Sequence, residues 1–346
     1  MPLDKPAISV IIVTYNCERY LPLSVESILS QDFSDLELIV VDNASTDGTK
    51  QFLDSIRDPR LVRIVNTKNG GPQAANLALP MARGKYIARL DADDVAMPGR
   101  LGRQLQYLET HPEIALCSCE YQEINEIGTA GNRSCGVHDP FEIRWKLGWE
   151  NFIGHSTIMT RTEAMIEAGG YREDLWCVQD YDLISRIALV SNAFMLPECL
   201  VQYRVYPQSI TFTRSDELLK TSLLVSKAHL EASLGVTLDG ETAIAAVEIM
   251  RNRVRQVPTK WREALKLIEK YTCCQARRSP PGTARFIRRE TARLLLRYAR
   301  VHCDANRRKR LLFEQSMIRI FPWQLVTRAY AALSKKRVRA VSVPPM

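Results

Sequence analysis

The sequence predicts an α/β fold in which a mixed, mostly parallel sheet is flanked by helices and followed by a mainly helical C-terminal region. Over the first hundred residues, short runs rich in β-branched residues alternate with segments of helical periodicity. Polar residues follow the ends of several of these runs. From about residue 215 onward, turn-forming residues become scarce and helix formers dominate. Alternation of the first kind is typical of βαβ units, which bring parallel strands into one sheet.

Four apolar runs predict buried strands in the first hundred residues, at 8–13, 36–41, 61–65 and 86–90. The segments between them have apolar residues at helical spacing, and the third is an Ala-rich helix from Gln73 to about Ala82. The same criteria predict further elements in the middle of the chain. These are helices at 101–109 and 180–190, strands at 114–118 and 158–160, and a loop at 128–136.

The charge of the chain is distributed unevenly along its 346 residues. The net charge is +8, but residues 215–346 contain 27 Lys and Arg against 11 Asp and Glu, which leaves the preceding part at −8. A basic region of this kind predicts an anionic partner, and a solvated helical surface is the alternative. No RNA-binding motif with interleaved aromatic residues is evident, so we expect no nucleic-acid partner.

The nine cysteines and the hydropathy indicate a cytoplasmic protein. No CxxC pair and no zinc-ligand spacing occurs, so we expect reduced thiols. No apolar run approaches the roughly 20 residues that span a bilayer. Asp4 lies where a signal peptide would be basic, and we therefore expect no export signal.

Three carboxylates follow the fourth predicted strand, at Asp91, Asp93 and Asp94. Carboxylates this close repel one another unless a cation neutralises them, and oxygen ligands suit Mg²⁺ or Mn²⁺. A solvated turn or a helix cap ahead of Met97 is the alternative. Asp42 ends a neighbouring predicted strand, and the carboxyl ends of parallel strands meet at one edge of a sheet. This convergence favours a metal site that holds a diphosphate.

Two further carboxylates, Asp180 and Asp182, precede an apolar helical pattern. Capping of the helix N-terminus explains at least one of them. Group transfer to a hydroxyl needs a carboxylate within hydrogen-bond reach of the attacking oxygen, and we assign this general base to Asp180. Asp182 is expected to be structural.

Five segments, taken in order, resemble the glycosyltransferase family 2 enzymes over about residues 7–212. They are residues 8–16, 40–49, 69–76, 82–94 with the motif Asp91-Ala92-Asp93, and 169–183 with Gln179-Asp180. The resemblance implies a GT-A (Rossmann-like) fold, a nucleotide-diphosphate sugar donor, Mn²⁺ or Mg²⁺, and inversion by a single displacement. It also implies that residues 1–110 are the nucleotide-sugar-binding half and 111–214 the acceptor-side half. Composition predicts that residues 215–346 form a basic helical C-terminal region.

The resemblance carries roles to individual positions. It implies that Asp180 is the catalytic base and that Asp91 and Asp93 hold the metal and the diphosphate. Asp94 and His155 are further candidate metal ligands, although a buried structural role suits His155 equally well. The residues implied for nucleotide binding are Thr14, Tyr15, Asn16, Asp42, Asn69 and Asp91.

The sequence departs from the family pattern in two places. Gln179 stands where many members have Glu, which removes a like charge beside Asp180 and would leave that carboxyl more acidic. Tyr206 stands where many members have a His near the metal. The Gln-x-x-Arg-Trp motif of processive members is absent, which favours addition of a single sugar.

These observations predict a metal-dependent, UDP-sugar-dependent transferase. The expected acceptor is a hydroxyl of a saccharide or lipid-linked saccharide in surface polysaccharide synthesis. We expect peripheral attachment to an anionic membrane at the inner face of the cell membrane, through about residues 280–340. The apolar residues there could instead pack a helical subdomain or a homodimer.

Three other classes were considered. A degenerate GT-A protein that binds a membrane or a partner is the alternative function. A dinucleotide dehydrogenase is excluded because no GxGxxG follows a strand. A sugar nucleotidyltransferase is disfavoured because the first predicted strand is followed by Thr14-Tyr15-Asn16 and not by a Gly-rich loop.

Overall fold

The computed structural model describes residues 5–209, 213–252 and 258–302, which form two compact units. The sheet unit comprises the described residues up to Ile143 together with Asn151–Val225. The helical unit comprises Arg144–Glu150 and the described residues from Ser226 onward. The short segment Arg144–Glu150 therefore leaves the sheet unit in the middle of the chain and packs with the C-terminal helices.

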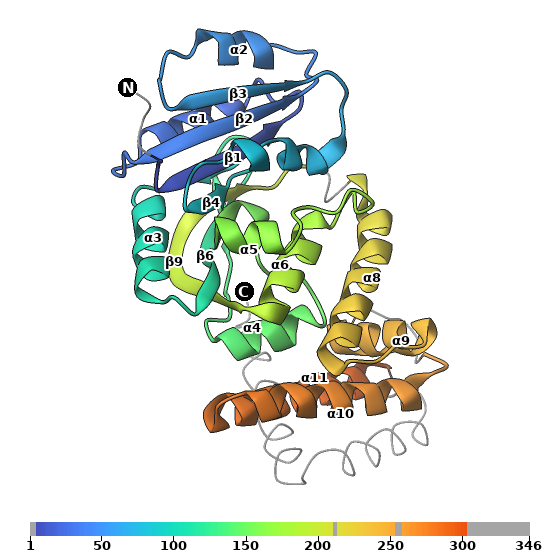
Figure 1. The fold of residues 1–346 in the computed structure, drawn as a ribbon. Helices are drawn as coiled ribbons and strands as arrows, with labels where there is room; N and C mark the ends of the chain where they lie inside the picture. The colour runs from blue at the N-terminus through green and yellow to red at the C-terminus, as the bar shows by residue number, and fades with distance from the viewer. Residues whose placement is uncertain (1–4, 210–212, 253–257, 303–346) are drawn as a thin grey trace, which may run out of the picture. The chain divides into compact units, whose positions relative to one another are not determined.

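The sheet unit is built on one mixed sheet with the strand order β3-β2-β1-β4-β8-β6-β9-β5, and β7 pairs with β6 (Figure 1). The pairs β3–β2, β2–β1, β1–β4 and β6–β9 are parallel, whereas β8 is antiparallel to both β4 and β6. The strands are β1 (Ile8–Thr14), β2 (Leu36–Asn43), β3 (Leu61–Asn66), β4 (Tyr86–Arg89), β5 (Val95–Ala96), β6 (Ile114–Ile124), β7 (Ala130–Arg133), β8 (Met159–Arg161) and β9 (Asn192–Arg204). The predicted α/β fold and its first four strands are confirmed.

A buried polar contact joins the beginnings of β1, β2 and β4. The Ser9 hydroxyl donates to Glu37 Oε1 at 2.6 Å and accepts from the Gly84 N–H at 2.8 Å. Arg83 pairs with Glu37 at 2.8 Å. A Cβ on Gly84 would lie 2.5 Å from the Ser9 nitrogen, so only glycine lets the chain enter β4 this close to β1. The contact fixes where β4 starts, and hence where the acidic segment after it lies.

Six α-helices connect these strands: α1 (Leu21–Leu29), α2 (Thr49–Ser55), α3 (Arg100–Thr110), α4 (Pro140–Leu147), α5 (Thr162–Glu167) and α6 (Gln179–Val190). Two predictions were wrong. The Ala-rich helix expected at 73–82 is a pair of short 3₁₀ helices, Gly71–Leu77 and Leu79–Met81, and Pro80, which cannot donate an N–H, lies in the second of them. The expected loop at 128–136 contains β7, which pairs with β6.

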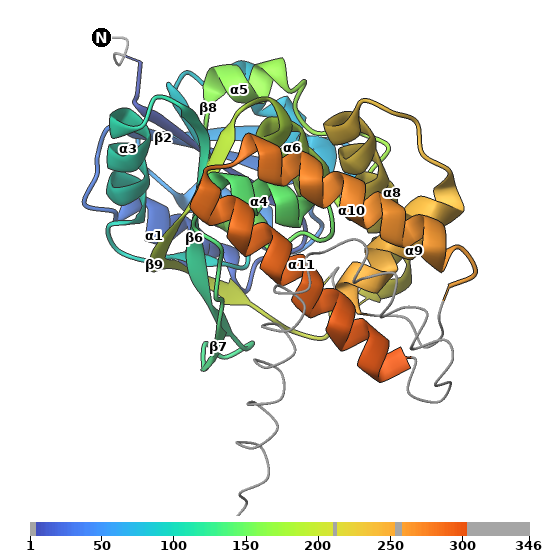
Figure 2. The ribbon, with the colours of Figure 1, turned by 90° about the horizontal axis from the view of Figure 1, so that it is seen from below.

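The helical unit contains the part of α8 (Ser215–Leu234) from Ser226 onward, then α9 (Gly240–Arg251), α10 (Trp261–Arg278) and α11 (Pro281–His302). Helices α10 and α11 run side by side (Figure 2). Tyr271 of α10 contacts both ends of the segment Arg144–Glu150. Its hydroxyl donates to the Arg144 carbonyl at 2.9 Å, and its ring packs edge-on against Trp149. Ile287 and Leu295 of α11 are fully buried. Ile287, Leu295 and Leu296, which were expected at a membrane surface, therefore pack inside this unit, whereas Val301 is 60% exposed. The part of 280–340 beyond residue 302 lies outside the described residues.

Within the described ranges, no helix has the length and apolarity needed to cross a bilayer. The eight cysteines in these ranges are all unpaired thiols.

His229 makes the helical unit sensitive to acid. Its ring is buried beside the Tyr271 hydroxyl at 3.1 Å, and burial lowers its pKa to about 3. Below the unfolded pKa of about 6.5, the unfolded chain takes up a proton that the folded chain refuses, so stability falls with pH by about 1.4 kcal/mol per unit. We expect His229→Gln to remove this part of the slope between pH 6 and 4 in denaturant titrations. An unchanged slope would contradict the assignment.

Candidate active site

A cavity of about 600 Å³ lies where β1, β2 and β4 end. The turns after these strands form one side of it, and residues that follow β9 and precede α6 form the other. Its lining includes Tyr15, Asn16, Asn43, Asn69, Arg89, Asp91, Asp93, Asp94, His155, Trp176, Gln179, Arg204 and Tyr206. Parallel strands thus bring together side chains that are up to about two hundred positions apart in the sequence.

Most of the predicted site residues line this cavity, but Thr14, Asp42 and Asp180 are not among its lining residues. Thr14 is buried, and its hydroxyl has no hydrogen-bond partner within the described residues. Asp42 is buried as well, and its Oδ1 accepts from the Ser45 N–H at 3.0 Å. Asp180 is half-buried next to Gln179, which does line the cavity.

Asparagine side chains connect the turns that follow β1, β2 and β3, in the part of the cavity where the sequence predicts nucleotide binding. The Asn16 Oδ1 accepts from the Thr46 N–H at 2.8 Å, which ties the turn after β1 to the turn after β2. Asn43 donates to Asn69 Oδ1 at 2.8 Å and accepts from the Gly70 N–H at 3.1 Å. All of these bonds are internal, so they pre-organise the turns before any ligand binds.

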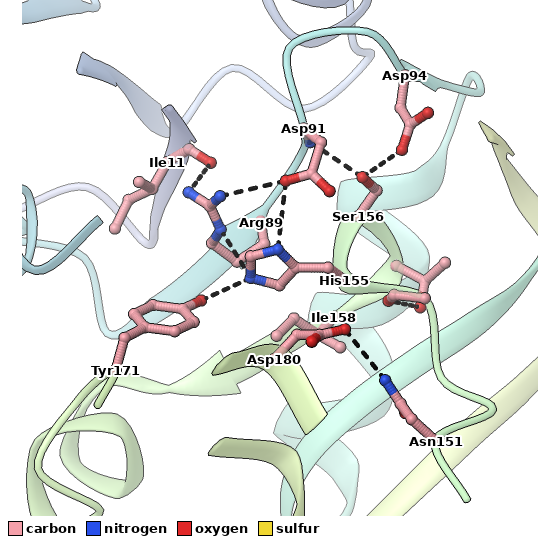
Figure 3. A network of polar contacts seen from close by, with 12 residues as sticks. Ile11, Arg89, Asp91, Asp94, Asn151, His155, Ser156, Ile158, Tyr171 and Asp180 are labelled. Atoms are coloured by element: carbon pink, nitrogen blue, oxygen red, sulfur yellow. Dashed lines mark hydrogen bonds and ion pairs between the residues drawn. The ribbon is translucent and has the colours of Figure 1, made fainter. Parts of the chain in front are cut away.

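Asp91 is held by two donors, Arg89 and His155 (Figure 3). Arg89 Nη2 lies 3.3 Å and His155 Nδ1 lies 3.2 Å from Asp91 Oδ1. Arg89 Nε donates to His155 Nε2 at 3.3 Å, and the Tyr171 hydroxyl lies 2.9 Å from the same nitrogen. Because arginine only donates, His155 Nε2 accepts, and the ring proton is on Nδ1, facing Asp91. Both ring nitrogens are thus used within the protein, which does not favour His155 as a metal ligand.

The three neighbouring carboxyls have different environments. Burial alone would raise the pKa of Asp91, but His155 and the Arg89 guanidinium hold it well below its usual range. Burial and the charge of Asp91 raise the pKa of Asp93 to about 6. Asp94 is fully buried, and its oxygens accept from the Ser156 hydroxyl and, at 2.7 Å, from the Arg204 N–H. Asp94 is therefore engaged inside the protein, and Asp91 and Asp93 are the carboxylates that a ligand in the cavity can reach.

Tyr206 contacts the acidic segment directly. Its hydroxyl donates to Asp93 Oδ2 at 2.9 Å, and its ring lies 5.6 Å from that of Tyr20. Tyr206, which stands where a His was expected from the resemblance, therefore restrains a carboxylate of the acidic segment.

The donor set fits a divalent ion that is shared with a ligand. No cluster of three or more His, Cys, Asp or Glu side chains able to hold a metal occurs among the described residues. Mg²⁺ is commonly held by only one or two carboxylates, with substrate phosphates and water completing its shell. Asp91 and Asp93 line one cavity and repel each other, as the raised pKa of Asp93 shows, and a cation between them would relieve this repulsion.

Asp180 lies in the first turn of α6, where Asn151 Nδ2 donates to its Oδ2 at 3.0 Å (Figure 3). Burial raises its pKa above the ordinary value. This direction is opposite to the one expected from Gln179, because desolvation outweighs the missing neighbouring charge. Asp182 pairs with Arg186 at 2.7 Å and is buried, as expected of a structural residue.

Three residues of the site, Arg89, Asn43 and Asn151, were not predicted from the sequence. Arg89 had a recognisable signal, since a charged residue inside an otherwise apolar strand must find a partner when it is buried. Asn43 and Asn151 had none, because a single amide next to a motif is common in any turn.

Comparisons with known proteins identify the family to which the chain belongs. The family model for glycosyl transferase family 2 matches residues 9–168. An uncharacterised glycosyltransferase of Methanocaldococcus jannaschii is 35% identical over 234 residues, which cover 66% of this chain and 80% of that relative. The UDP-Glc:alpha-D-GlcNAc-diphosphoundecaprenol beta-1,3-glucosyltransferase of Escherichia coli is 30% identical over 232 residues, which cover 65% and 88%.

Two solved structures share the fold. S. aureus TarS 1-349 in complex with UDP-GlcNAc has a TM-score of 0.56 at 18% identity and covers 83% of this chain and 86% of its own. The mannosyltransferase PcManGT from Pyrobaculum calidifontis, in complex with GDP-Man and Mn²⁺, has a TM-score of 0.52 at 20% identity and covers 95% and 87%. The mixed sheet with its cavity at the strand ends is a GT-A fold. The chain belongs to glycosyltransferase family 2.

Arg89 should be important for stability as well as for the site. Its side chain is 2% exposed, and Arg89→Met would remove the guanidinium charge beside Asp91 and one of the two donors to the Ile11 carbonyl, which leaves Asp91 with His155 alone. We expect the free energy of unfolding in urea to fall by about 2–4 kcal/mol. Arg103→Met removes an exposed pair with Glu198 and should lower the free energy of unfolding far less than Arg89→Met does. Equal losses in the two variants would contradict the role given to Arg89.

Proposed function

We propose that this glycosyltransferase moves one sugar, with inversion, from a UDP-linked donor to a hydroxyl of a saccharide or lipid-linked saccharide acceptor. The observation that carries the proposal is the contrast between Asp91 and Asp180. Asp91 is kept ionised by Arg89 and His155, whereas burial raises the pKa of Asp180. Carboxyls whose environments push their pKa values apart serve different steps, here ligand binding and proton transfer.

The donor would occupy the cavity. Tyr15, Asn16 and Asn69 line the end proposed for the nucleoside, while Thr14 and Asp42 would support it from below the surface. Asp91 and Asp93 would hold Mn²⁺ or Mg²⁺ and, through it, the diphosphate. The ion supplies positive charge that stabilises the departing nucleoside diphosphate. The nucleotide-sugar complexes of TarS and PcManGT support a nucleotide-sugar donor, and the Mn²⁺ of PcManGT supports a divalent metal.

Asp180 would act on the acceptor. Asn151 holds its Oδ2, which leaves Oδ1 to take the proton of the acceptor hydroxyl. The acceptor oxygen forms a bond to the anomeric carbon while the bond from that carbon to the diphosphate oxygen breaks. One displacement inverts the configuration, and the absence of the Gln-x-x-Arg-Trp motif favours a single addition.

Relatives indicate the class of acceptor. The E. coli relative is named for a diphosphoundecaprenol-linked acceptor sugar, and a Bacillus subtilis relative is named as a putative teichuronic acid biosynthesis glycosyltransferase. We extend the proposal to surface polysaccharide synthesis by a cytoplasmic enzyme that attaches peripherally to the inner face of the cell membrane. The basic C-terminal region supports this attachment. The proposed homodimer through the same helices is the competing use of that region.

Asp180→Asn tests the proposed chemistry. The variant keeps the size and the contact with Asn151 but cannot accept a proton, so transfer should fall by at least about 10³-fold. Binding of UDP-sugars with Mn²⁺, measured by thermal shift, should stay near that of the wild type. The exposed neighbour Asp174→Asn should retain full transfer. Near-normal transfer by Asp180→Asn would show that the base is misassigned. An absence of turnover by the wild type with every nucleotide sugar would favour the degenerate binding protein.

A further inference from the structure

A second cavity, of about 480 Å³, lies in the helical unit against α10. Four cations, one carboxylate, two thiols and the last residue of α8 line it. They are Lys266, Lys270, Arg277 and Arg278, Glu269, Cys273 and Cys274, and Leu234. A concave surface with three net positive charges is suited to phosphate groups.

The cations form a line along one side of α10. Lys266, Lys270 and Arg277 are separated by four and seven residues, which places them on one face of an α-helix. The opposite face, which includes Leu265, Ile268 and Thr272, is buried. Eleven residues separate the two ends, so the line is about 16 Å long.

These cations have no ion-pair partner among the described residues, although other cations of the same unit do. Lys227 pairs with Glu231 at 2.7 Å, and Arg293 pairs with Glu290. Like charges four residues apart destabilise a helix slightly, so the proximity of Lys266 and Lys270 does not stabilise α10. The helix dipole favours Arg277 and Arg278 in the last turn but not the two lysines in the middle. The charges of this line are therefore not offset within the described residues, and they are available to an anion outside the fold.

We infer that this line of cations on α10 binds the phosphate headgroups of an anionic lipid surface, an inference that rests on the proposed peripheral attachment. The line is longer than a single diphosphate, whose two phosphates share one oxygen, and it therefore fits several headgroups side by side. Ile287, Leu295 and Leu296 of α11 are buried inside the unit. Attachment through the described helices is accordingly electrostatic and not by insertion of an apolar face.

Vesicle sedimentation of the full chain tests the inference. Wild-type protein should bind phosphatidylglycerol–phosphatidylcholine vesicles at low salt, lose this binding at high salt, and ignore pure phosphatidylcholine. The triple variant Lys266→Gln, Lys270→Gln, Arg277→Gln should bind about 100-fold more weakly, at roughly fivefold per cation. The matched variant Lys5→Gln, Lys50→Gln, Arg57→Gln removes three exposed cations from the sheet unit and should bind like the wild type.

Three outcomes would overturn the inference: equal binding to neutral and anionic vesicles, unchanged binding by the α10 variant, or an equal loss in the matched variant. Binding of inorganic pyrophosphate that the α10 variant loses, without any vesicle binding, would assign the groove to a soluble phosphate instead. The α10 variant should keep wild-type binding of UDP-sugars, which separates this test from the proposed function. A failure of the Asp180 prediction leaves the vesicle result unaffected.

Discussion

The pairing of Arg89 with Asp91 is the interaction on which the site depends. A guanidinium buried in β4 needs a counter-charge, and Asp91 two residues later supplies it at the surface of the cavity. The same arginine donates to the Ile11 carbonyl of β1 and to His155, so strand pairing, the ring proton of His155 and the ionisation of Asp91 are set together. Three other carboxyls, those of Asp93, Asp94 and Asp180, do not pair with Arg89, and their other contacts determine what each can do.

Local contacts give three chemically identical carboxyls different orientations and partners. They are those of Asp93, Asp94 and Asp180. Asp94 is turned inward by Ser156 and Arg204, and Asp93 is restrained by Tyr206 at the cavity wall. Asp180 lies at the start of α6 and is oriented by Asn151. Asn151 is also the residue at which the chain returns from the helical unit to the sheet unit.

Much of this could be predicted from the sequence because it rests on local pattern. Apolar runs predicted β1 to β4, and the order of the strands brought Asn16 and Asp91 to one edge. β9 was not predicted, since Pro197 and the bulged pairing with β6 obscure its alternation. The acidic cluster was expected to need a metal for neutralisation. The structure shows that the protein's own Arg89 and His155 offset Asp91, a long-range pairing that no single segment reveals.

The central claim is that one base, Asp180, and one ionised binding residue, Asp91, perform a single displacement. The anomeric configuration of the product tests this most directly. Proton NMR of the disaccharide formed from an α-linked UDP-sugar, recorded during the reaction, should show a β-linked product from the first turnover onward. An α-linked product would require a second displacement or another mechanism, and would contradict the roles assigned to both carboxyls.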